Sequence, residues 1–333
     1  MSAPTVPTVN GPVPVDELGT TLMHEHVFVT SPEVRENWPA PGWDEDVQIE
    51  EAVNRLAAAK AAGVDTIVDL TVFGLGRYVP RVAEVARRSE VNIVVATGAY
   101  VLHELPVYFH FRGPGAPLGG PDLLFEYFVR DITEGIGDTG IRAAMLKCVT
   151  DVDGLTVDVE RTLRSVARAH LATGVPITTH THAGTRRGLD QQRVFAEEGV
   201  DLSRVVIGHC GDTDDFDYLE QLVAAGSYLG MDRFGLETVP FDKRVEIVVE
   251  MCRRGHANRM VLSHDTSCWS DMSDPEQRRR QHPNWHWLHI SQDVVPALLA
   301  RGVTREQVDQ MLVVNPREIF AHGGGYQKGT ADD

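Results

Sequence analysis

Histidines are frequent in this sequence, and several stand at or near the ends of short apolar runs. The chain has 14 histidines among 333 residues. His24 and His26 lie in the run LMHEHVF. His180 ends the run ITTH, and His209 ends the run VVIGH. Imidazole is a preferred ligand of zinc, iron, cobalt and manganese, so these four positions are candidate metal ligands.

Two further polar residues share this pattern: Lys147 lies in MLKCV, and Asp265 ends VLSHD. Four imidazoles, a carboxylate and an amine are too many ligands for one tetrahedral ion, and they suit two ions that share a bridging group. A charged ammonium would repel two cations, but burial would favour the neutral amine of Lys147. A neutral amine can react with carbon dioxide, and the resulting carbamate could bridge both ions.

Apolar runs alternate with amphipathic stretches along most of the chain. The runs predict parallel strands at Leu18–Phe28, Thr66–Val72, Ile93–Tyr100, Ala143–Val149, Pro176–His182, Val205–His209, Ser227–Phe234 and Met260–Asp265. The stretches that predict helices include Val47–Ala62, Val79–Ser89, Val157–Ala172 and Val245–Arg254. Eight strand–helix units predict an α/β fold with a single (β/α)8 TIM barrel. A doubly wound sheet is the competing fold, but its first strand would normally precede a glycine-rich turn, where this sequence has MHEH.

A barrel would bring the six polar residues to one place. Residues i and i+2 of a strand face the same side, so His24 and His26 both point inward. Active sites of such barrels lie at the carboxyl ends of the strands, where the other four residues are also expected. Each residue alone has an ordinary explanation, such as a hydrogen-bonded core histidine or a capping aspartate. Their joint order over five strands predicts a dinuclear metal site.

Composition limits the other possibilities. We expect one domain over residues 1–333, with an N-terminal arm at 1–15 and a flexible tail at 323–333. The 31 basic and 48 acidic residues give a net charge of −17, which argues against nucleic acid or an anionic membrane as the main partner. The four cysteines form no CxxC motif, the start lacks a signal peptide pattern and no apolar run could span a membrane. These features predict a cytoplasmic protein.

The motifs around the candidate ligands resemble the phosphotriesterase family of the amidohydrolase superfamily, and most closely its lactonase branch. The matching segments are TLMHEH, MLKC, ITTHTHAG, VIGHCGD and LSHD, and the resemblance extends over nearly the whole chain. It implies a buried metal ion held by His24, His26 and Asp265. It implies a more exposed ion held by His180 and His209. Carbamylated Lys147 and a hydroxide would bridge the two divalent ions, which could be Zn, Fe, Co or Mn.

Two positions separate the branches of this family. VATGAY places Tyr100 where the lactonases have a tyrosine, and GMDRFG places Arg233 where phosphotriesterases are expected to have a histidine. With Asp265, these two residues form the predicted catalytic group. Asp212 matches an aspartate that would relay protons, although Arg233 replaces the histidine of that relay. His182 has no certain role; it is expected to be a neighbour of the pocket.

The resemblance implies hydrolysis of lactones, with N-acyl-homoserine lactones as candidate substrates, hence quorum quenching, and phosphotriesters as side substrates. The alternatives are a phosphotriesterase proper, a dinuclear amidohydrolase acting on cyclic amides, or a non-catalytic homologue. A homodimer is expected. Its interface could be formed by aromatic residues of the early loops, which could instead pack the loops themselves: Trp38, Trp43, Tyr108, Phe109 and Phe111. Besides Tyr100 and Arg233, the candidates for an apolar substrate channel are Phe28, Leu102, Trp269, Met272 and Trp285.

Overall fold

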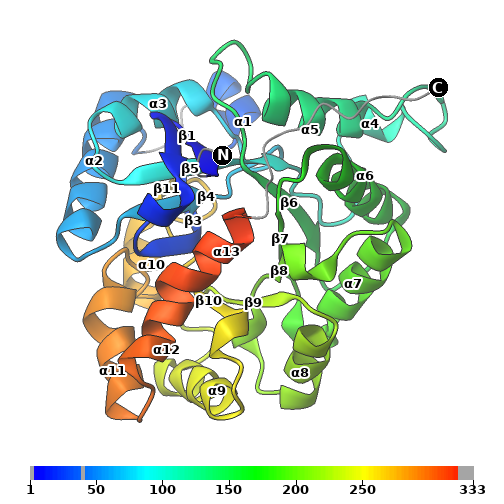
Figure 1. Cartoon of the computed structure of the whole chain (residues 1–333). Helices are drawn as coiled ribbons and strands as arrows, with labels where there is room; N and C mark the ends of the chain where they lie inside the picture. Colours follow the sequence, from blue (N-terminus) through cyan, green and yellow to red (C-terminus); the bar gives the residue numbers. More distant parts are fainter. Residues whose placement is uncertain (1–3, 39–41, 322–333) are drawn as a thin grey trace.

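A ring of parallel strands lies at the centre of the computed structural model, which describes residues 4–38 and 42–321 (Figure 1). Its eight successive strands are β3 (Thr21–Val29), β4 (Thr66–Asp69), β5 (Asn92–Gly98), β6 (Met145–Thr150), β7 (Ile177–Thr181), β8 (Val205–Ile207), β9 (Tyr228–Met231) and β10 (Met260–Leu262). Each overlaps one of the eight apolar runs. Consecutive strands from β3 to β10 pair in parallel, so the predicted TIM-type α/β barrel is confirmed.

Helices surround the strands, as Figure 1 shows. They are α1 (Pro32–Asn37), α2 (Glu45–Ala61), α3 (Val79–Arg87), α4 (Val107–His110), α5 (Leu123–Thr133), α6 (Val157–Thr173), α7 (Arg187–Glu197), α8 (Phe216–Ala224), α9 (Phe241–Arg253), α10 (Pro275–Gln281), α11 (Val295–Ala300), α12 (Arg305–Asp309) and α13 (Asn315–Ala321). The four amphipathic stretches correspond to α2, α3, α6 and α9. Within the described ranges, no helix is long and apolar enough to cross a membrane.

The ring closes between β3 and β10 through the segment that follows β10. An additional strand, β11 (Ser267–Ser270), pairs in parallel with β3. The buried carboxylate of Glu25 accepts hydrogen bonds from the Ser263 hydroxyl and from the backbone N–H groups of His264 and Thr266. None of the eight apolar runs predicted β11. The edge of β3 carries backbone donors and acceptors that need partners, and β11 supplies them.

The amino-terminal end of the barrel is covered by a hairpin. Strands β1 (Thr5–Thr8) and β2 (Gly11–Pro14) pair antiparallel within the predicted N-terminal arm. The Val9 N–H donates to the carbonyl of Ile93 at the start of β5, over 2.9 Å. The predicted flexible tail at 323–333 lies outside the described residues.

The barrel interior near this hairpin is apolar. Met145, Val206 and Val261 are almost fully buried there, and they cluster with Leu18 and Phe320 from the covering segments. Such side chains need no hydrogen-bonding partner, so they can fill the closed end of the barrel without a desolvation cost.

Candidate metal centre

The six predicted ligands line one pocket of about 250 Å³ in the barrel. They are His24 and His26 on β3, Lys147 on β6, His180 on β7, His209 after β8 and Asp265 after β10. Tyr100, Arg233, Met272 and Trp285 also line this pocket. The structure therefore brings together all six proposed ligands and four of the seven residues proposed to contact substrate.

The first group of donors comes from β3 and from the turn after β10. The Nε2 atoms of His24 and His26 lie 3.4 and 3.2 Å from Oδ1 of Asp265. The register between β3 and β4 shifts between Leu22 and Glu25, yet both imidazoles reach the pocket. Two imidazoles and a carboxylate this close together could hold one metal ion.

The second group of donors comes from β7 and from the turn after β8. Nδ1 of His180 lies 2.9 Å from Nε2 of His209. The same His209 nitrogen lies 3.9 Å from Oδ2 of Asp265, so the two groups of donors are neighbours. Two ions held in these groups would therefore share the space beside Asp265.

Lys147 lies beside the first group. Its Nζ is 3.1 Å from Nε2 of His24 and 3.2 Å from the carbonyl oxygen of Thr179. The side chain is only 1% exposed, and burial lowers its pKa to about 8. A buried lysine with a lowered pKa is largely a neutral nucleophile at mildly alkaline pH, which is the form that a carbamate requires.

Burial also keeps three of the imidazoles in the form that binds metal. It lowers the pKa values of His24, His180 and His209 below the ordinary value of 6.5. Neutral imidazole has a free lone pair for an ion, whereas imidazolium has none. These donors are therefore ready to bind a cation at neutral pH.

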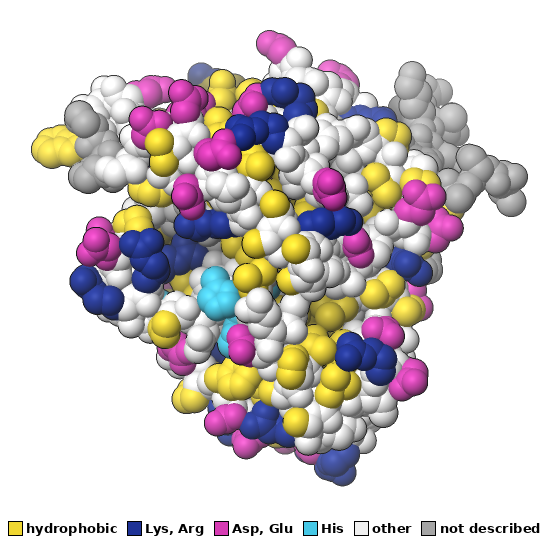
Figure 2. Space-filling model, turned by 90° about the vertical axis from the view of Figure 1, so that its left-hand side faces the viewer, with side chains coloured by type: hydrophobic (Ala, Val, Ile, Leu, Met, Phe, Trp, Pro, Cys, Tyr) yellow, Lys and Arg dark blue, Asp and Glu magenta, His cyan; other side chains and the backbone are white. Residues whose placement is uncertain are grey.

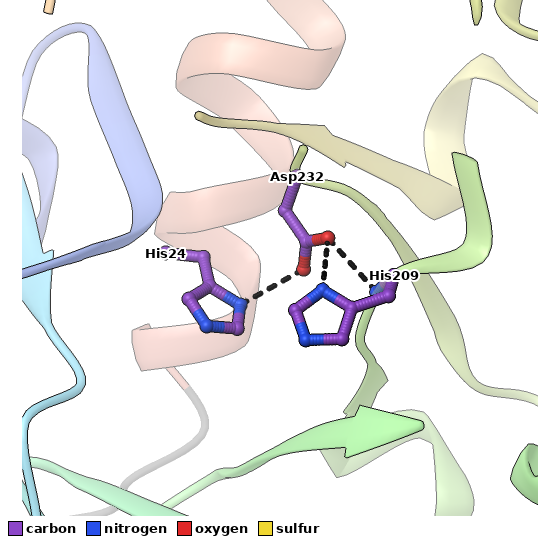
Figure 3. A group of neighbouring side chains, drawn as sticks. All are labelled: His24, His209 and Asp232. Atoms are coloured by element: carbon purple, nitrogen blue, oxygen red, sulfur yellow. Dashed lines mark hydrogen bonds and ion pairs between the residues drawn. The ribbon is translucent and has the colours of Figure 1, made fainter. Parts of the chain in front are cut away.

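Asp232 orients two of the histidines, and the sequence analysis did not identify it. Its carboxylate lies between their rings, 2.9 Å from Nδ1 of His24 and 2.9 Å from Nδ1 of His209 (Figure 3). It also accepts from the His209 backbone N–H. With both Nδ1 atoms occupied, both Nε2 atoms point to the other donors. His24, His209 and Asp232 could themselves hold an ion. An orienting role for Asp232 explains the same contacts and leaves His24 and His209 free to act in the two groups of donors.

Two other partners complete this outer layer. The hydroxyl of Thr71 lies 2.9 Å from Nδ1 of His26, and the carboxylate of Asp151 lies 3.0 Å from Nε2 of His180. Each ligand imidazole thus has an oxygen on its far nitrogen, as metal-binding histidines usually have. The only sequence signal for these partners was a polar residue at or just after the end of an apolar run.

Two of the proposed ligands have an unusual backbone. His209 and Asp265 have φ angles of 60° and 55°, in the left-handed region that residues other than glycine rarely adopt. Both lie in the turns that follow short strands, β8 and β10, and the turn directs each side chain into the pocket. Such strain is often retained where function requires a particular side-chain direction.

Arg233 is held between two carboxylates. Its Nε donates to Asp265 over 3.1 Å, and its Nη1 donates to Asp212 over 2.9 Å. Buried Arg244 donates to the other oxygen of Asp212 over 2.6 Å.

The Tyr100 ring lies edge-on to the His180 ring at 5.5 Å between centroids. Burial raises the pKa of Tyr100 to about 12, so its hydroxyl remains a hydrogen-bond donor.

Four other predicted positions lie outside the pocket lining. Phe28 is buried against Trp43, and Trp269 also packs against Trp43. Leu102 is 45% exposed. His182 is exposed and bonds to the Thr185 hydroxyl rather than to the pocket, because β7 ends at Thr181 and strand alternation stops there.

Comparisons with known proteins agree with this geometry. The model of the phosphotriesterase family matches residues 4–320. A phosphotriesterase homology protein of Mycobacterium tuberculosis is 61% identical over 325 residues, which cover 97% of this chain and all of the relative. An aryldialkylphosphatase of Saccharolobus solfataricus is 38% identical over 92% of this chain and 96% of its own. A solved phosphotriesterase structure from M. tuberculosis is 60% identical, covers 97% of this chain and 100% of its own, and superimposes with a TM-score of 0.95.

Proposed function

The chain belongs to the phosphotriesterase family of metal-dependent hydrolases, and we propose that within this family it is a lactonase with a dinuclear centre. The proposed substrates are lactones, with N-acyl-homoserine lactones as the first candidates and quorum quenching as the consequence. Phosphotriesters would be slower side substrates, because their tetrahedral phosphorus resembles the tetrahedral intermediate of lactone hydrolysis.

The donor set fits two divalent ions. His24, His26 and Asp265 would hold one ion, and His180 and His209 would hold the other. As a carbamate, Lys147 would contribute an anionic bridge, whereas its charged ammonium form would repel the two cations. When bound, the ions supply positive charge that polarises a carbonyl group and makes a water molecule acidic enough to ionise near neutral pH. Zn, Fe, Co and Mn all suit these ligands.

The side chains of the pocket would perform the remaining steps. In lactone hydrolysis, a water oxygen bonds to the carbonyl carbon, and the bond between that carbon and the ring oxygen breaks. Asp265 would accept the proton of the water and pass it to the ring oxygen. The Tyr100 hydroxyl would donate to the substrate and orient its carbonyl group. Arg233 would fix the direction of the Asp265 carboxylate.

The observation that carries the lactonase proposal is that Tyr100 and Arg233 both line the small pocket of the proposed ligands. A space of about 250 Å³ suits the ring of a lactone, whose side arm would extend out of the pocket. Arg233 forms ion pairs with Asp265 and Asp212, which hold it in place in the pocket wall.

The test is a substrate panel with the purified, metal-analysed protein. We expect kcat/KM for a medium-chain acyl-homoserine lactone to exceed kcat/KM for paraoxon by orders of magnitude. Phosphotriesterase activity proper is the second candidate, since a relative 38% identical to this chain is named an aryldialkylphosphatase. A panel in which paraoxon is the better substrate by orders of magnitude would favour that candidate and overturn the lactonase proposal.

We also propose a cytoplasmic homodimer. The structure separates the aromatic residues expected at an interface: Phe109 is buried, whereas Trp38, Tyr108 and Phe111 are 70%, 57% and 41% exposed. The three exposed rings support an interface near the early loops. Sedimentation equilibrium with the wild type and Trp38→Ser should show a dimer that the substitution weakens; a monomeric wild type would contradict the proposal.

A further inference from the structure

A second and larger cavity adjoins the pocket that the six proposed ligands line, here called the metal pocket. It measures about 670 Å³ and lies between α2 and the segment that runs from β11 through α10 to Leu288. The two cavities share the lining residues Ser267, Ser270, Ser273, Arg278 and Trp285. A ligand with a side arm could therefore contact both spaces across this common wall.

Arg278 is the charged residue of the common wall. Its Nη1 and Nη2 donate to the hydroxyls of Ser267 and Thr266, over 2.7 and 2.6 Å. Its guanidinium stacks on the Trp285 ring, 4.1 Å from the ring centroid. In the part of the chain that the structure describes, no carboxylate forms an ion pair with Arg278. It is a partly buried cation whose neighbours orient it without neutralising it.

Other basic side chains line the same cavity. Arg55 of α2 donates to the carbonyl oxygen of Cys268 over 2.7 Å, and its distance to the exposed Glu51 carboxylate is 3.9 Å. Arg279 and His282 also contribute to the lining, and Glu51 is the one acidic residue among the described residues of that lining. Burial, together with the repulsion from Arg55, lowers the pKa of Arg278 to about 10. Figure 2, which views the face bearing α2 and α10, shows Lys and Arg side chains and a histidine around a hollow.

The sizes and charges indicate what this cavity accepts. The metal pocket alone is smaller than most sites that enclose a whole ligand, so an extended substrate arm needs neighbouring space. The protein carries a net charge of −17, which disfavours the approach of anions to most of its surface. The basic side chains that line this cavity therefore differ from the surface as a whole. Paired guanidinium groups are well suited to bind a carboxylate by charge-assisted hydrogen bonds.

We propose that the cavity between α2 and α10 is a substrate subsite for an anionic terminus, with Arg278 and Arg55 as its binding residues. The preferred substrates are then lactones whose side arm ends in a carboxylate. The inference rests on the proposed lactonase function and specifies its substrate class.

Matched substrates test this subsite. N-succinyl, N-glutaryl and N-adipoyl homoserine lactones are compared with methyl-terminated N-acyl homoserine lactones of similar arm length. For the wild type, we expect the KM of the best anionic substrate to be at least about tenfold lower than that of its neutral partner, with similar kcat. Arg278→Met should remove this preference, Arg278→Lys should retain part of it, and Arg55→Met should weaken it. The preference should also decrease with added salt.

Arg280→Met is the matched control, because Arg280 lies on the same helix, is 72% exposed and is absent from both linings. It removes the same charge and should leave the preference intact. Equal use of both substrate types by the wild type, with lactones still hydrolysed, would overturn the subsite and leave the lactonase proposal standing. So would a preference that Arg280→Met abolishes as strongly as Arg278→Met does.

A binding measurement separates this inference from the proposed function. If no lactone is hydrolysed, the lactonase proposal fails, and calorimetry with glutarate then tests the cavity without turnover. Binding by the wild type and by Arg280→Met, but not by Arg278→Met, would support an anion subsite. The absence of glutarate binding would overturn it. Glutarate binding combined with no preference for anionic lactones would identify a site for free anions and overturn the assignment to a substrate arm.

Discussion

The two ends of the barrel interior bury different kinds of side chain on the same strands. On β6, Met145 joins the apolar cluster, and Lys147, two residues later, reaches the metal pocket. The same change occurs from Val206 on β8 to His209 in the turn that follows it. All four side chains are at least 98% buried, so exposure does not distinguish them.

The difference lies in what each environment demands. An apolar side chain gains stability from burial alone, whereas a buried amine or imidazole needs hydrogen-bonding partners or a ligand. Lys147 and His209 have such partners, and burial lowers the pKa of each. The closed end therefore contributes stability, while the open end uses burial to set protonation states.

The largest effect is expected from Lys147→Ala. It removes the proposed bridging group, so kcat/KM should fall by about 10³-fold or more, and metal content should drop below two ions per chain. Metal analysis and steady-state kinetics measure both quantities. The control is Met145→Leu at the closed end, which should retain full metal content; a Lys147→Ala protein with two tightly held ions would contradict the bridging role.

Asp232→Asn should have the next largest effect. The amide cannot accept hydrogen bonds from two imidazoles through two equivalent oxygens, so His24 and His209 would lose their fixed orientation. We expect metal affinity or activity to fall about 10–100-fold, as measured by competition with a chelator. Asp214→Asn, at an exposed aspartate, is the matched control. An Asp232→Asn variant with unchanged metal affinity would show that the rings are held by packing alone.

The pH dependence of metal loading should be smaller but diagnostic. With its pKa lowered to about 8, Lys147 is neutral in about 3% of molecules at pH 6.5 and in about half at pH 8. At constant dissolved carbon dioxide, the rate of loading the apoprotein should therefore rise roughly tenfold over this range. Burial lowers the pKa values of His24, His180 and His209 below 6.5, so these three imidazoles contribute little to the change. Loading that is equally fast at both pH values would argue against a carbamate.

The smallest effect on chemistry is expected at the closed end. Met145→Ala should reduce the free energy of unfolding by about 2–5 kcal/mol while changing kcat/KM little. Lys147→Met should have the reverse pattern: activity should be lost, whereas the midpoint temperature of unfolding should be maintained or raised. The reason is that an apolar side chain replaces a buried amine. Thermal unfolding monitored by circular dichroism tests both. A stabilising effect of Met145→Ala would break the division between the two ends.

The sequence predicted the eight barrel strands and the pocket-lining ligands because local patterns carry that information. Short apolar runs mark parallel strands, and a polar residue near the end of such a run is conspicuous. Strand β11 and the partners Asp232, Thr71 and Asp151 were missed. Their roles depend on contacts with segments far along the chain, which periodicity does not reveal.

The sequence by itself thus determined the class of fold and which residue types stand near the strand ends, since both follow from local hydrophobic periodicity. Only the tertiary structure decided which nitrogen of each histidine faces the pocket, because distant oxygens occupy the other nitrogen. It also decided that His182 lies outside the pocket and that Arg278 lines both cavities without an ion pair to any carboxylate of the described residues. Side-chain direction after a strand end depends on packing against other segments, and no local pattern specifies that packing.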